Sequence, residues 1–247
     1  MIVNTIPVTA FSQNCRILLD EQTGASLVID PGGDVQSIFA LIEILVTELS
    51  SLKCPNIFLT HAHLDHCGGV VRLTELLQEK FSLKPKLYAH RLESQMRANV
   101  ARQAMMFGAS PEEFQNVPEP DEYLEDEQIF TFGQYKGRIL FTPGHSPGHV
   151  SLFFPTLEVK DQTFVISSKG LKLFQQKIYT SPLLIAGDTL FQGSIGRTDL
   201  PGGDFATLAQ SIKEKLYTLP DETIVKSGHG EDTIIEDEKR YNPFVKG

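Results

Sequence analysis

Four side chains of the kinds that bind metals lie within six residues of this chain. The pattern His-x-His-x-Asp-His comprises His61, His63, Asp65 and His66, and chance would produce it in only about 3 of 10,000 chains of this composition. Imidazole nitrogens and carboxylate oxygens are the usual nitrogen and oxygen ligands of zinc and neighbouring metals. A backbone that turns here from strand to helix can direct the first pair to one metal and the second pair to another. The motif therefore predicts a site for two metals rather than a histidine-rich surface loop.

Four ligands are too few to enclose two metals, and three further donors follow apolar, strand-like segments. They are His145 in TPGHSPGH, Asp188 in AGDT and His229 in GHG. Each is flanked by glycine, which allows the backbone to approach a site closely. Loops at the ends of strands are where functional side chains gather. We therefore expect these three residues to join the first four, so that seven donors converge.

The composition limits the class of protein. The chain has 247 residues, 41% of them hydrophobic, which is enough for a substantial core. Its net charge of −9 argues against a nucleic-acid partner, because phosphate binding needs a basic face. No apolar run approaches the roughly 18 residues that span a bilayer, so no membrane association is expected. Three scattered cysteines without a CxxC pair, and no secretory signal, favour the reducing cytoplasm.

The elements that must position the donors alternate between strands and helices in two halves. Apolar patterning and turn residues predict strands at residues 15–20, 25–30, 56–60, 86–89, 129–132, 138–142, 150–154, 163–167, 183–186 and 223–226, and helices at 35–50, 70–80, 91–106 and 205–219. Sheet faces that helices do not cover must cover each other. We therefore expect one domain over residues 1–247, with two sheets packed together and helices on both outer faces.

Four local features carry more specific expectations. Asp34 is expected to cap the helix at 35–50. The stretch 157–181 is either a hairpin extension or an insertion. The apolar residues at 105–107 either pack in the core or form a lid beside a pocket, and Cys67 is interpreted as a small buried residue rather than a metal ligand.

The order of these motifs resembles that of the metallo-β-lactamase superfamily. The motif HxHxDH is followed by a histidine in TPGH, then by GDT and GHG, as in that superfamily. Three further segments, IPVTAFSQNC (6–15), IDPGGD (29–34) and GSIGRTD (193–199), are similar to short hydroxyacylglutathione hydrolases, also called type II glyoxalases. The resemblance spans nearly the whole chain and implies a four-layer αββα sandwich, an α/β fold that agrees with the layers expected above.

The resemblance also implies how the donors divide. One metal takes His61, His63 and His145, the other takes Asp65, His66 and His229, and Asp188 bridges both. The metals are two divalent ions, zinc by preference, with iron or manganese as alternatives.

Residues outside the seven donors are assigned supporting roles. Asp30 is expected to orient a ligand, and His149 to be structural or to orient a ligand in the same way. The resemblance implies that Arg197 meets a carboxylate of glutathione, and a salt bridge to Asp199 or Asp204 is the alternative.

The implied activity is hydrolysis of a small-molecule thioester, S-D-lactoylglutathione or a related hydroxyacyl thioester. A water shared by two cations loses a proton near neutral pH, and the metal-bridging hydroxide is the nucleophile that Asp65 orients. Longer members of the family carry a helical C-terminal domain with basic contacts to glutathione. Only 18 residues follow His229 here, so other thioesters are also expected as substrates.

Two other activities of the superfamily are alternatives. A mononuclear Fe(II) persulfide dioxygenase shares HxHxDH and GRTD, but in that family the second histidine of the TPGH segment tends to be replaced, whereas His149 is present here. A lactonase or β-lactamase ranks lower, because the segments at 6–15 and 193–199 match the thioester group. The sequence does not indicate the oligomeric state.

Overall fold

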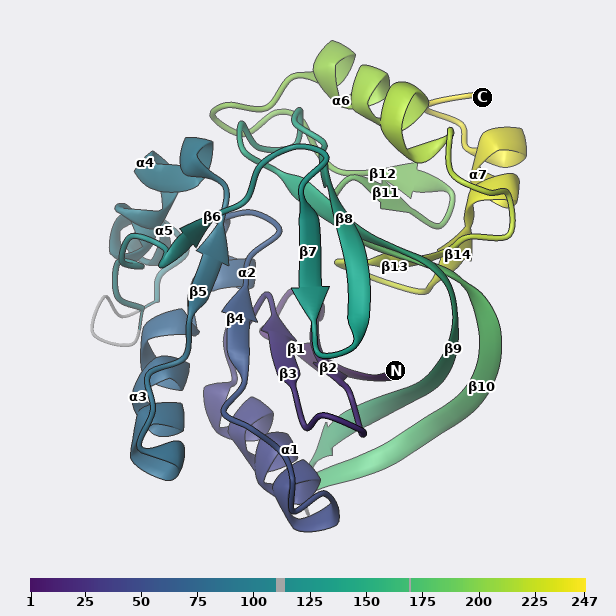
Figure 1. The fold of residues 1–247 in the computed structure, drawn as a ribbon. Helices are drawn as coiled ribbons and strands as arrows, with labels where there is room; N and C mark the ends of the chain where they lie inside the picture. The colour runs from purple at the N-terminus through teal and green to yellow at the C-terminus, as the bar shows by residue number, and fades with distance from the viewer. Residues whose placement is uncertain (110–113, 169) are drawn as a thin grey trace.

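Most of the strands form one hydrogen-bonded sheet that is folded into two layers (Figure 1). The computed structural model describes residues 1–109, 114–168 and 170–247. The first layer contains β1 (Ile2–Val8), β2 (Gln13–Leu19), β3 (Ser26–Ile29), β4 (Asn56–Phe58), β5 (Leu87–Ala89) and β6 (Glu122–Tyr123). The second contains β7 (Ile129–Phe132), β8 (Tyr135–Phe141), β13 (Ile224–Ser227) and β14 (Thr233–Ile234). A small separate pair joins β11 (Leu190–Phe191) to β12 (Ser194–Ile195).

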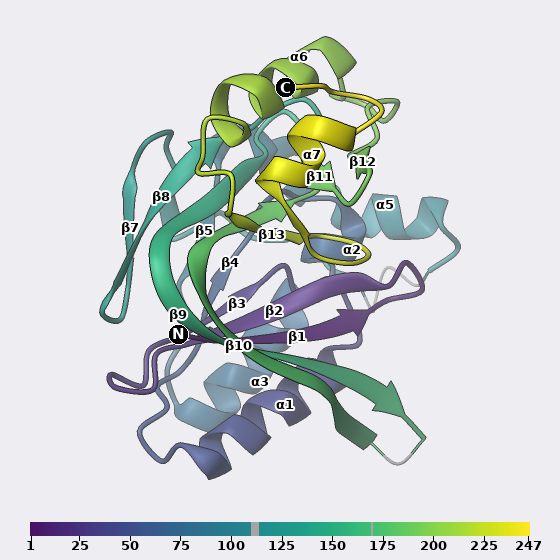
Figure 2. The ribbon, with the colours of Figure 1, turned by 90° about the vertical axis from the view of Figure 1, so that its right-hand side faces the viewer.

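Two long strands connect the layers. β9 (Val150–Ser167) and β10 (Gly170–Gly187) have 18 residues each and curve from one layer into the other (Figure 2). The first part of β9 pairs with β8, and its later part pairs in parallel with β1. The expectation of two separate sheets was therefore wrong in one respect: the two layers are one hydrogen-bonded sheet.

Helices cover the outer face of each layer. The first layer is covered by α1 (Val35–Glu48), α2 (Leu64–Cys67) and α3 (Val70–Phe81), with η1 (Arg91–Glu93), α4 (Ser94–Arg97) and α5 (Val100–Met106) at its edge. The second is covered by α6 (Phe205–Ser211), which continues into the π-helical turn η2 (Ile212–Leu216), and by α7 (Ile235–Tyr241). No helix in the described ranges is long and apolar enough to cross a membrane.

Three apolar clusters separate the four layers. Successive residues of a strand point to opposite faces, so a strand buried on both faces supplies two clusters. Leu183 and Ile185 of β10 point between the two layers, whereas Leu184 and Ala186 point to α6 and η2. In β2, Leu18 also points between the layers, and its neighbours face α1 and α3. The α/β sandwich expected from the sequence is thereby confirmed.

Several expected boundaries differ from the structure. The strands expected at 150–154 and 163–167 are parts of β9, and β1 was not expected at all. The helix expected at 91–106 is divided, because Asn99 has a φ of −125° and its side-chain amide donates to the Gln95 carbonyl. The residues at 105–107 are exposed, so the interpretation as core packing was wrong.

Asp34 does not cap α1 with its side chain. Its backbone is left-handed, with a φ of 47°, and its carboxylate accepts a hydrogen bond from the backbone N–H of Thr9 at 2.6 Å. The carboxylate therefore joins two loops beside the site rather than bonding to the first turn of α1.

The stretch 157–181 is a hairpin extension formed by the paired ends of β9 and β10, with residue 169 outside the described residues. It contacts α1 and places Leu171 against the first apolar cluster. In both views it runs beside α1 and away from α2, whose residues belong to the HxHxDH motif (Figures 1 and 2).

Candidate metal centre

The seven donors expected from the sequence converge at one end of the two layers. His61 and His63 follow β4, and Asp65 and His66 lie in the short helix α2. His145 lies between β8 and β9, Asp188 directly after β10, and His229 two residues after the end of β13. Every donor therefore lies in or next to a connection that follows a strand.

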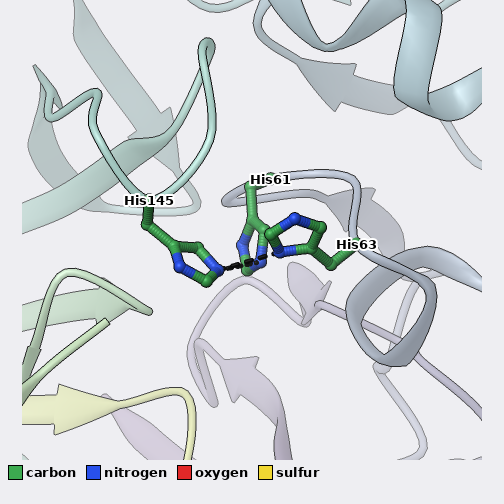
Figure 3. Close-up of side chains that lie close together, drawn as sticks. All are labelled: His61, His63 and His145. Carbon is green, nitrogen blue, oxygen red and sulfur yellow. Dashed lines mark hydrogen bonds between the residues drawn. The ribbon is translucent and has the colours of Figure 1, made fainter. Parts of the chain in front are cut away.

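The first group consists of three imidazoles whose nitrogens face one point (Figure 3). His145 Nε2 lies 2.8 Å from His63 Nδ1 and 3.2 Å from His61 Nε2. All three residues are buried. Nitrogens bound to a tetrahedral zinc at about 2.0–2.1 Å lie about 3.3 Å from one another, so this spacing suits a bound metal.

The second group consists of Asp65, His66 and His229. His229 Nε2 lies 3.2 Å from Asp65 Oδ2 and 3.3 Å from His66 Nε2. The group mixes one carboxylate oxygen with two imidazole nitrogens. It can hold a second divalent metal of the same kind.

Asp188 lies between the two groups. Its Oδ2 is 3.5 Å from both His145 Nε2 and His229 Nε2, and its Oδ1 is 3.4 Å from His66 Nε2. Oδ1 is buried and has no hydrogen-bond partner in the part of the chain that the structure describes. A buried carboxylate oxygen without a partner is costly, and a cation at this position would satisfy it. The donors present therefore fit two metals that share Asp188.

The protonation states of these groups also suit metal binding. Burial lowers the pKa of His63 to about 3, with neighbouring His145 adding to the effect, and it holds the pKa of His61 well below its ordinary value. Both imidazoles are therefore neutral and keep a lone pair for a metal. Burial would raise the pKa of Asp188, but the imidazoles around it, His66 first, outweigh burial and lower that pKa.

The second group lies in a negative field. Burial would lower the pKa of His66, but the carboxylates of Asp188 and Asp65 raise it well above its ordinary value. This potential favours a positive charge where His66, Asp65 and His229 meet.

Most of the donor imidazoles are oriented through their second ring nitrogen. Asp30 Oδ2 accepts from His66 Nδ1 at 2.9 Å and from the hydroxyl of Thr60 at 2.6 Å, so that hydroxyl accepts from His61 Nδ1. Backbone carbonyls accept from the other two, Arg197 O from His145 Nδ1 at 2.7 Å and Phe11 O from His229 Nδ1 at 3.1 Å. Such partners fix the tautomer that leaves the opposite nitrogen free for a metal.

Asp30 and His149 lie beside the donors. Both oxygens of Asp30 are occupied, because Oδ1 also accepts from the Thr60 backbone N–H at 2.7 Å. His149 Nε2 accepts from the Asp188 backbone N–H at 3.0 Å, and its Nδ1 bonds to Thr142. Both residues hold their neighbours in place and point no free atom at either metal position.

The backbone of Gly228 lies too close to the Asp188 carboxylate for a larger residue. A Cβ at this position would lie 2.0 Å from Asp188 Oδ1, so a larger residue would push the His229 loop away from the bridge. Asn14 and Arg16 hold that loop from the other side. The Asn14 amide donates to the carbonyls of Ser227 and Gly230, and the Arg16 guanidinium donates to Ser227 O.

The sequence analysis missed Glu93, a buried carboxylate that joins two donor loops. Its Oε2 accepts from the Ala62 backbone N–H at 2.7 Å. Its Oε1 accepts from the Ser146 hydroxyl at 2.9 Å and from the Gly148 N–H at 2.6 Å. Nothing in the local sequence distinguishes Glu93 from an exposed helical acid, because its partners come from segments about 30 and 55 residues away.

The remaining expectations concern Arg197 and Cys67. The Arg197 guanidinium is exposed and forms two bonds to Asp199, at 2.7 and 2.8 Å, so the salt-bridge alternative is present. Its role in binding substrate stays a prediction. Cys67 is buried in the first apolar cluster and belongs to none of the metal-capable groups found among the described residues.

Comparison with known proteins agrees with this geometry. A family model described as the metallo-beta-lactamase superfamily matches residues 8–159 and 177–229. The unmatched interval between them, 160–176, falls in the β9–β10 extension. A curated relative, hydroxyacylglutathione hydrolase GloC of Haemophilus influenzae, is 34% identical over 99% of this chain and 98% of its own length.

Two solved structures are similar over nearly their full length. The BLEG-1 B3 metallo-beta-lactamase has a TM-score of 0.73 and 34% identity, covering 99% of this chain and 100% of the other. TTHA1623 in a di-iron-bound form has a TM-score of 0.72 and 30% identity, covering 98% of this chain and 99% of the other.

Proposed function

Because the chain belongs to the metallo-beta-lactamase superfamily, we propose that it is a two-metal hydrolase of thioesters, S-D-lactoylglutathione or a related hydroxyacyl thioester among them. The observation that carries the proposal is the position of Asp188, within 3.5 Å of donors from both groups. The relative named as a hydroxyacylglutathione hydrolase supports the choice of thioester.

Each metal would be held by one of the two groups, with Asp188 shared between them. Two divalent ions at these positions would supply a Lewis acid for the substrate carbonyl and would lower the pKa of water to about 7. We take zinc as the first candidate, and iron and manganese as alternatives, since TTHA1623 is described in a di-iron-bound form.

The protein's own groups provide orientation and proton transfer. Asp65 lies at the edge of the site, and its carboxylate can accept a proton from an attacking water. His61 and His63 stay neutral because burial lowers their pKa values. The bond from His61 to the Thr60 hydroxyl keeps the His61 ring from rotating, and the bond from His66 to Asp30 does the same for the His66 ring.

The chain needs no serine or cysteine nucleophile for this reaction. Its sequence GHSPG at 144–148 matches the pattern GxSxG, but the hydroxyl of Ser146 is buried and donates to Glu93 Oε1 at 2.9 Å.

The second candidate is the mononuclear Fe(II) persulfide dioxygenase. It would use one group of donors, two histidines and an aspartate. The presence of both groups favours two metals over one: three histidines in the first, and in the second His229 Nε2 at 3.2 and 3.3 Å from Asp65 and His66.

One experiment separates the two candidates. Metal identity and stoichiometry would be measured on purified protein, with S-D-lactoylglutathione hydrolysis and persulfide-dependent oxygen uptake assayed in parallel. Two metals per chain with hydrolysis supports the proposal. One iron per chain with oxygen uptake and no hydrolysis would overturn it.

A further inference from the structure

Three phenylalanines lie near His229. Phe11 lies in the turn between β1 and β2, and its carbonyl accepts the hydrogen bond from His229 Nδ1 at 3.1 Å. The Phe11 ring packs edge-to-face on Phe107, which follows α5, with ring centroids 5.7 Å apart. The ring of Phe191 lies 6.2 Å from that of His229, also edge-to-face. Phe11 and Phe107 therefore form a touching pair that is bonded to His229 through the Phe11 backbone, and Phe191, from a third segment, contacts the His229 ring itself.

This aromatic cluster, which comprises Phe11, Phe107 and Phe191, is not part of the core. Phe11 is 50% exposed and Phe107 is 61% exposed, although they touch each other. Phe58, in contrast, is fully buried between the layers. Exposed apolar surface that is contiguous across two elements and adjoins a site marks a place where a ligand binds. In Figure 2 the tip of the β1–β2 hairpin and α5 lie on the same side of the molecule, next to α2.

The segments that carry the cluster contain no charged residue. They read TAFSQ at 9–13, MMFGA at 105–109 and TLFQGSI at 189–195. The cation assigned to a glutathione carboxylate, Arg197, is already bonded to Asp199. The surface beside His229 therefore complements hydrocarbon better than it complements an anionic group.

We propose that Phe11, Phe107 and Phe191 form an apolar subsite that takes the hydrocarbon portion of the substrate, an aliphatic chain of about four carbons or more attached near the thioester. This inference rests on the proposed function and specifies its substrate class. Chain length, rather than the charges of glutathione, then determines which thioesters are preferred.

The test uses thioethers, which cannot be hydrolysed because they lack the carbonyl. Binding of S-hexylglutathione and of S-methylglutathione to the metal-loaded protein would be measured by calorimetry. The two ligands share the same charges and differ by five methylene groups. Each buried methylene contributes about 0.8 kcal/mol, so partial burial of the chain is expected to make S-hexylglutathione bind at least about tenfold more tightly.

The double substitution Phe11→Ala with Phe107→Ala is expected to reduce this ratio to less than about threefold. Phe107→Lys is a second variant with the same expectation, and both positions are exposed enough that folding is retained. Phe174→Ala, at an exposed phenylalanine of the β9–β10 extension, is the matched control and should keep the ratio of the unaltered protein.

Three outcomes would overturn the subsite. Equal binding of both thioethers to the unaltered protein, or no binding of either, contradicts it, as does an unchanged ratio in both Phe107 variants. Hydrolysis of S-D-lactoylglutathione, assayed on the same preparation, reports on the proposed function separately. A preference for the longer chain without hydrolysis would support the subsite and contradict the proposed thioesterase activity. Hydrolysis without that preference would support the thioesterase activity and contradict the subsite.

Discussion

At the scale of single residues, the metal centre depends on hydrogen bonds to atoms that do not face the metals. His66, His145 and His229 each donate from Nδ1 to an oxygen of the protein, and their Nε2 atoms then point into the site. This arrangement fixes each ring and increases its basicity. The position of each of these three rings therefore depends on the loop that supplies the oxygen bonded to its Nδ1.

The bridging position of Asp188 leads to the first prediction. Asp188→Asn removes the shared charge, so both metal positions should lose affinity, and metal content should fall from about two to less than one per chain. Elemental analysis after gel filtration would measure it, with Asp237→Asn on α7 as an exposed control. Full metal content in Asp188→Asn would show that the carboxylate does not bridge.

Glu93 gives a second prediction. Glu93→Gln replaces one carboxylate oxygen by an NH₂ group, which cannot accept the hydrogen bonds that Glu93 now accepts from backbone N–H groups. A buried N–H group without a partner lowers the free energy of unfolding by about 1–3 kcal/mol. The loops of His61 and His145 should separate, weakening zinc binding by about tenfold or more, with a lower thermal midpoint of unfolding. Metal titration and thermal unfolding would test this, with Glu125→Gln, whose carboxylate pairs with Arg91 at the surface, as the control. Unchanged zinc affinity would remove Glu93 from the positioning of the centre.

The convergence of these seven side chains was predictable from the sequence, and most of the residues that hold them in place were not. Type and spacing identified His61 to His66, and glycine neighbours identified His145, Asp188 and His229. The contacts of Glu93, in contrast, come from loops that approach only after the layers have packed. Phe11 and Phe107 were missed as a pair for the same reason, since 96 positions separate them along the chain.

At the scale of elements, hairpins are tied to one another by buried polar side chains. Asp20 follows β2 and accepts bonds from the backbone and side chain of Gln134, in the turn between β7 and β8. It also accepts from the Thr23 hydroxyl. Burial would raise the pKa of Asp20, but these hydrogen bonds outweigh burial and lower that pKa.

This link predicts a pH-dependent contribution to stability. Because the folded-state pKa of Asp20 lies below its unfolded value of about 3.9, its contribution is present above that pH and is lost as the pH falls through the folded value. Asp20→Asn should lower the free energy of unfolding by about 1–2 kcal/mol at pH 7, and the difference should narrow below about pH 4. Urea unfolding at several pH values measures it, again with Asp237→Asn as control. A difference that stays constant across the range would contradict the hydrogen-bonded carboxylate as its cause.

The boundaries of an element were predictable where local sequence determines them. They were not predictable where contacts with distant segments determine them. The range expected for the helix at 70–80 nearly matches α3, and β7 matches its expected range. β9 extends across the whole of 150–167 because β8, β1 and β10 pair along it in turn, which no local pattern records. Asp34 has the right residue type for a cap, but its left-handed backbone directs it to Thr9.

At the scale of the whole molecule, the cluster between the two sheet layers brings the donor loops to one end. Phe58 of β4 is fully buried there and packs edge-to-face on Phe130 of β7, with centroids 5.4 Å apart. It therefore joins the layer that carries His61 and His63 to the layer that carries His145. The recurrence of strands and helices in two halves predicted two such layers, while their connection by two curved strands depends on pairing between distant segments.

Truncation of this contact gives a prediction for the fold as a whole. Phe58→Ala leaves a cavity between the layers and should lower the free energy of unfolding by about 3–5 kcal/mol. Denaturant unfolding of the metal-free protein would measure it, since bound metal would add its own stabilisation. Phe244→Ala, at an exposed phenylalanine near the C-terminus, should change it by less than about 0.5 kcal/mol. A loss at Phe58 no larger than at Phe244 would show that the layers do not depend on this packing.

The most direct test of the account is an anomalous-scattering map from crystals of the metal-loaded protein. Two peaks are predicted, about 3.5–4 Å apart, one facing His61, His63 and His145 and the other facing Asp65, His66 and His229, with the Asp188 carboxylate between them. A single peak at full occupancy, or a metal bound away from Asp188, would contradict the two-metal centre.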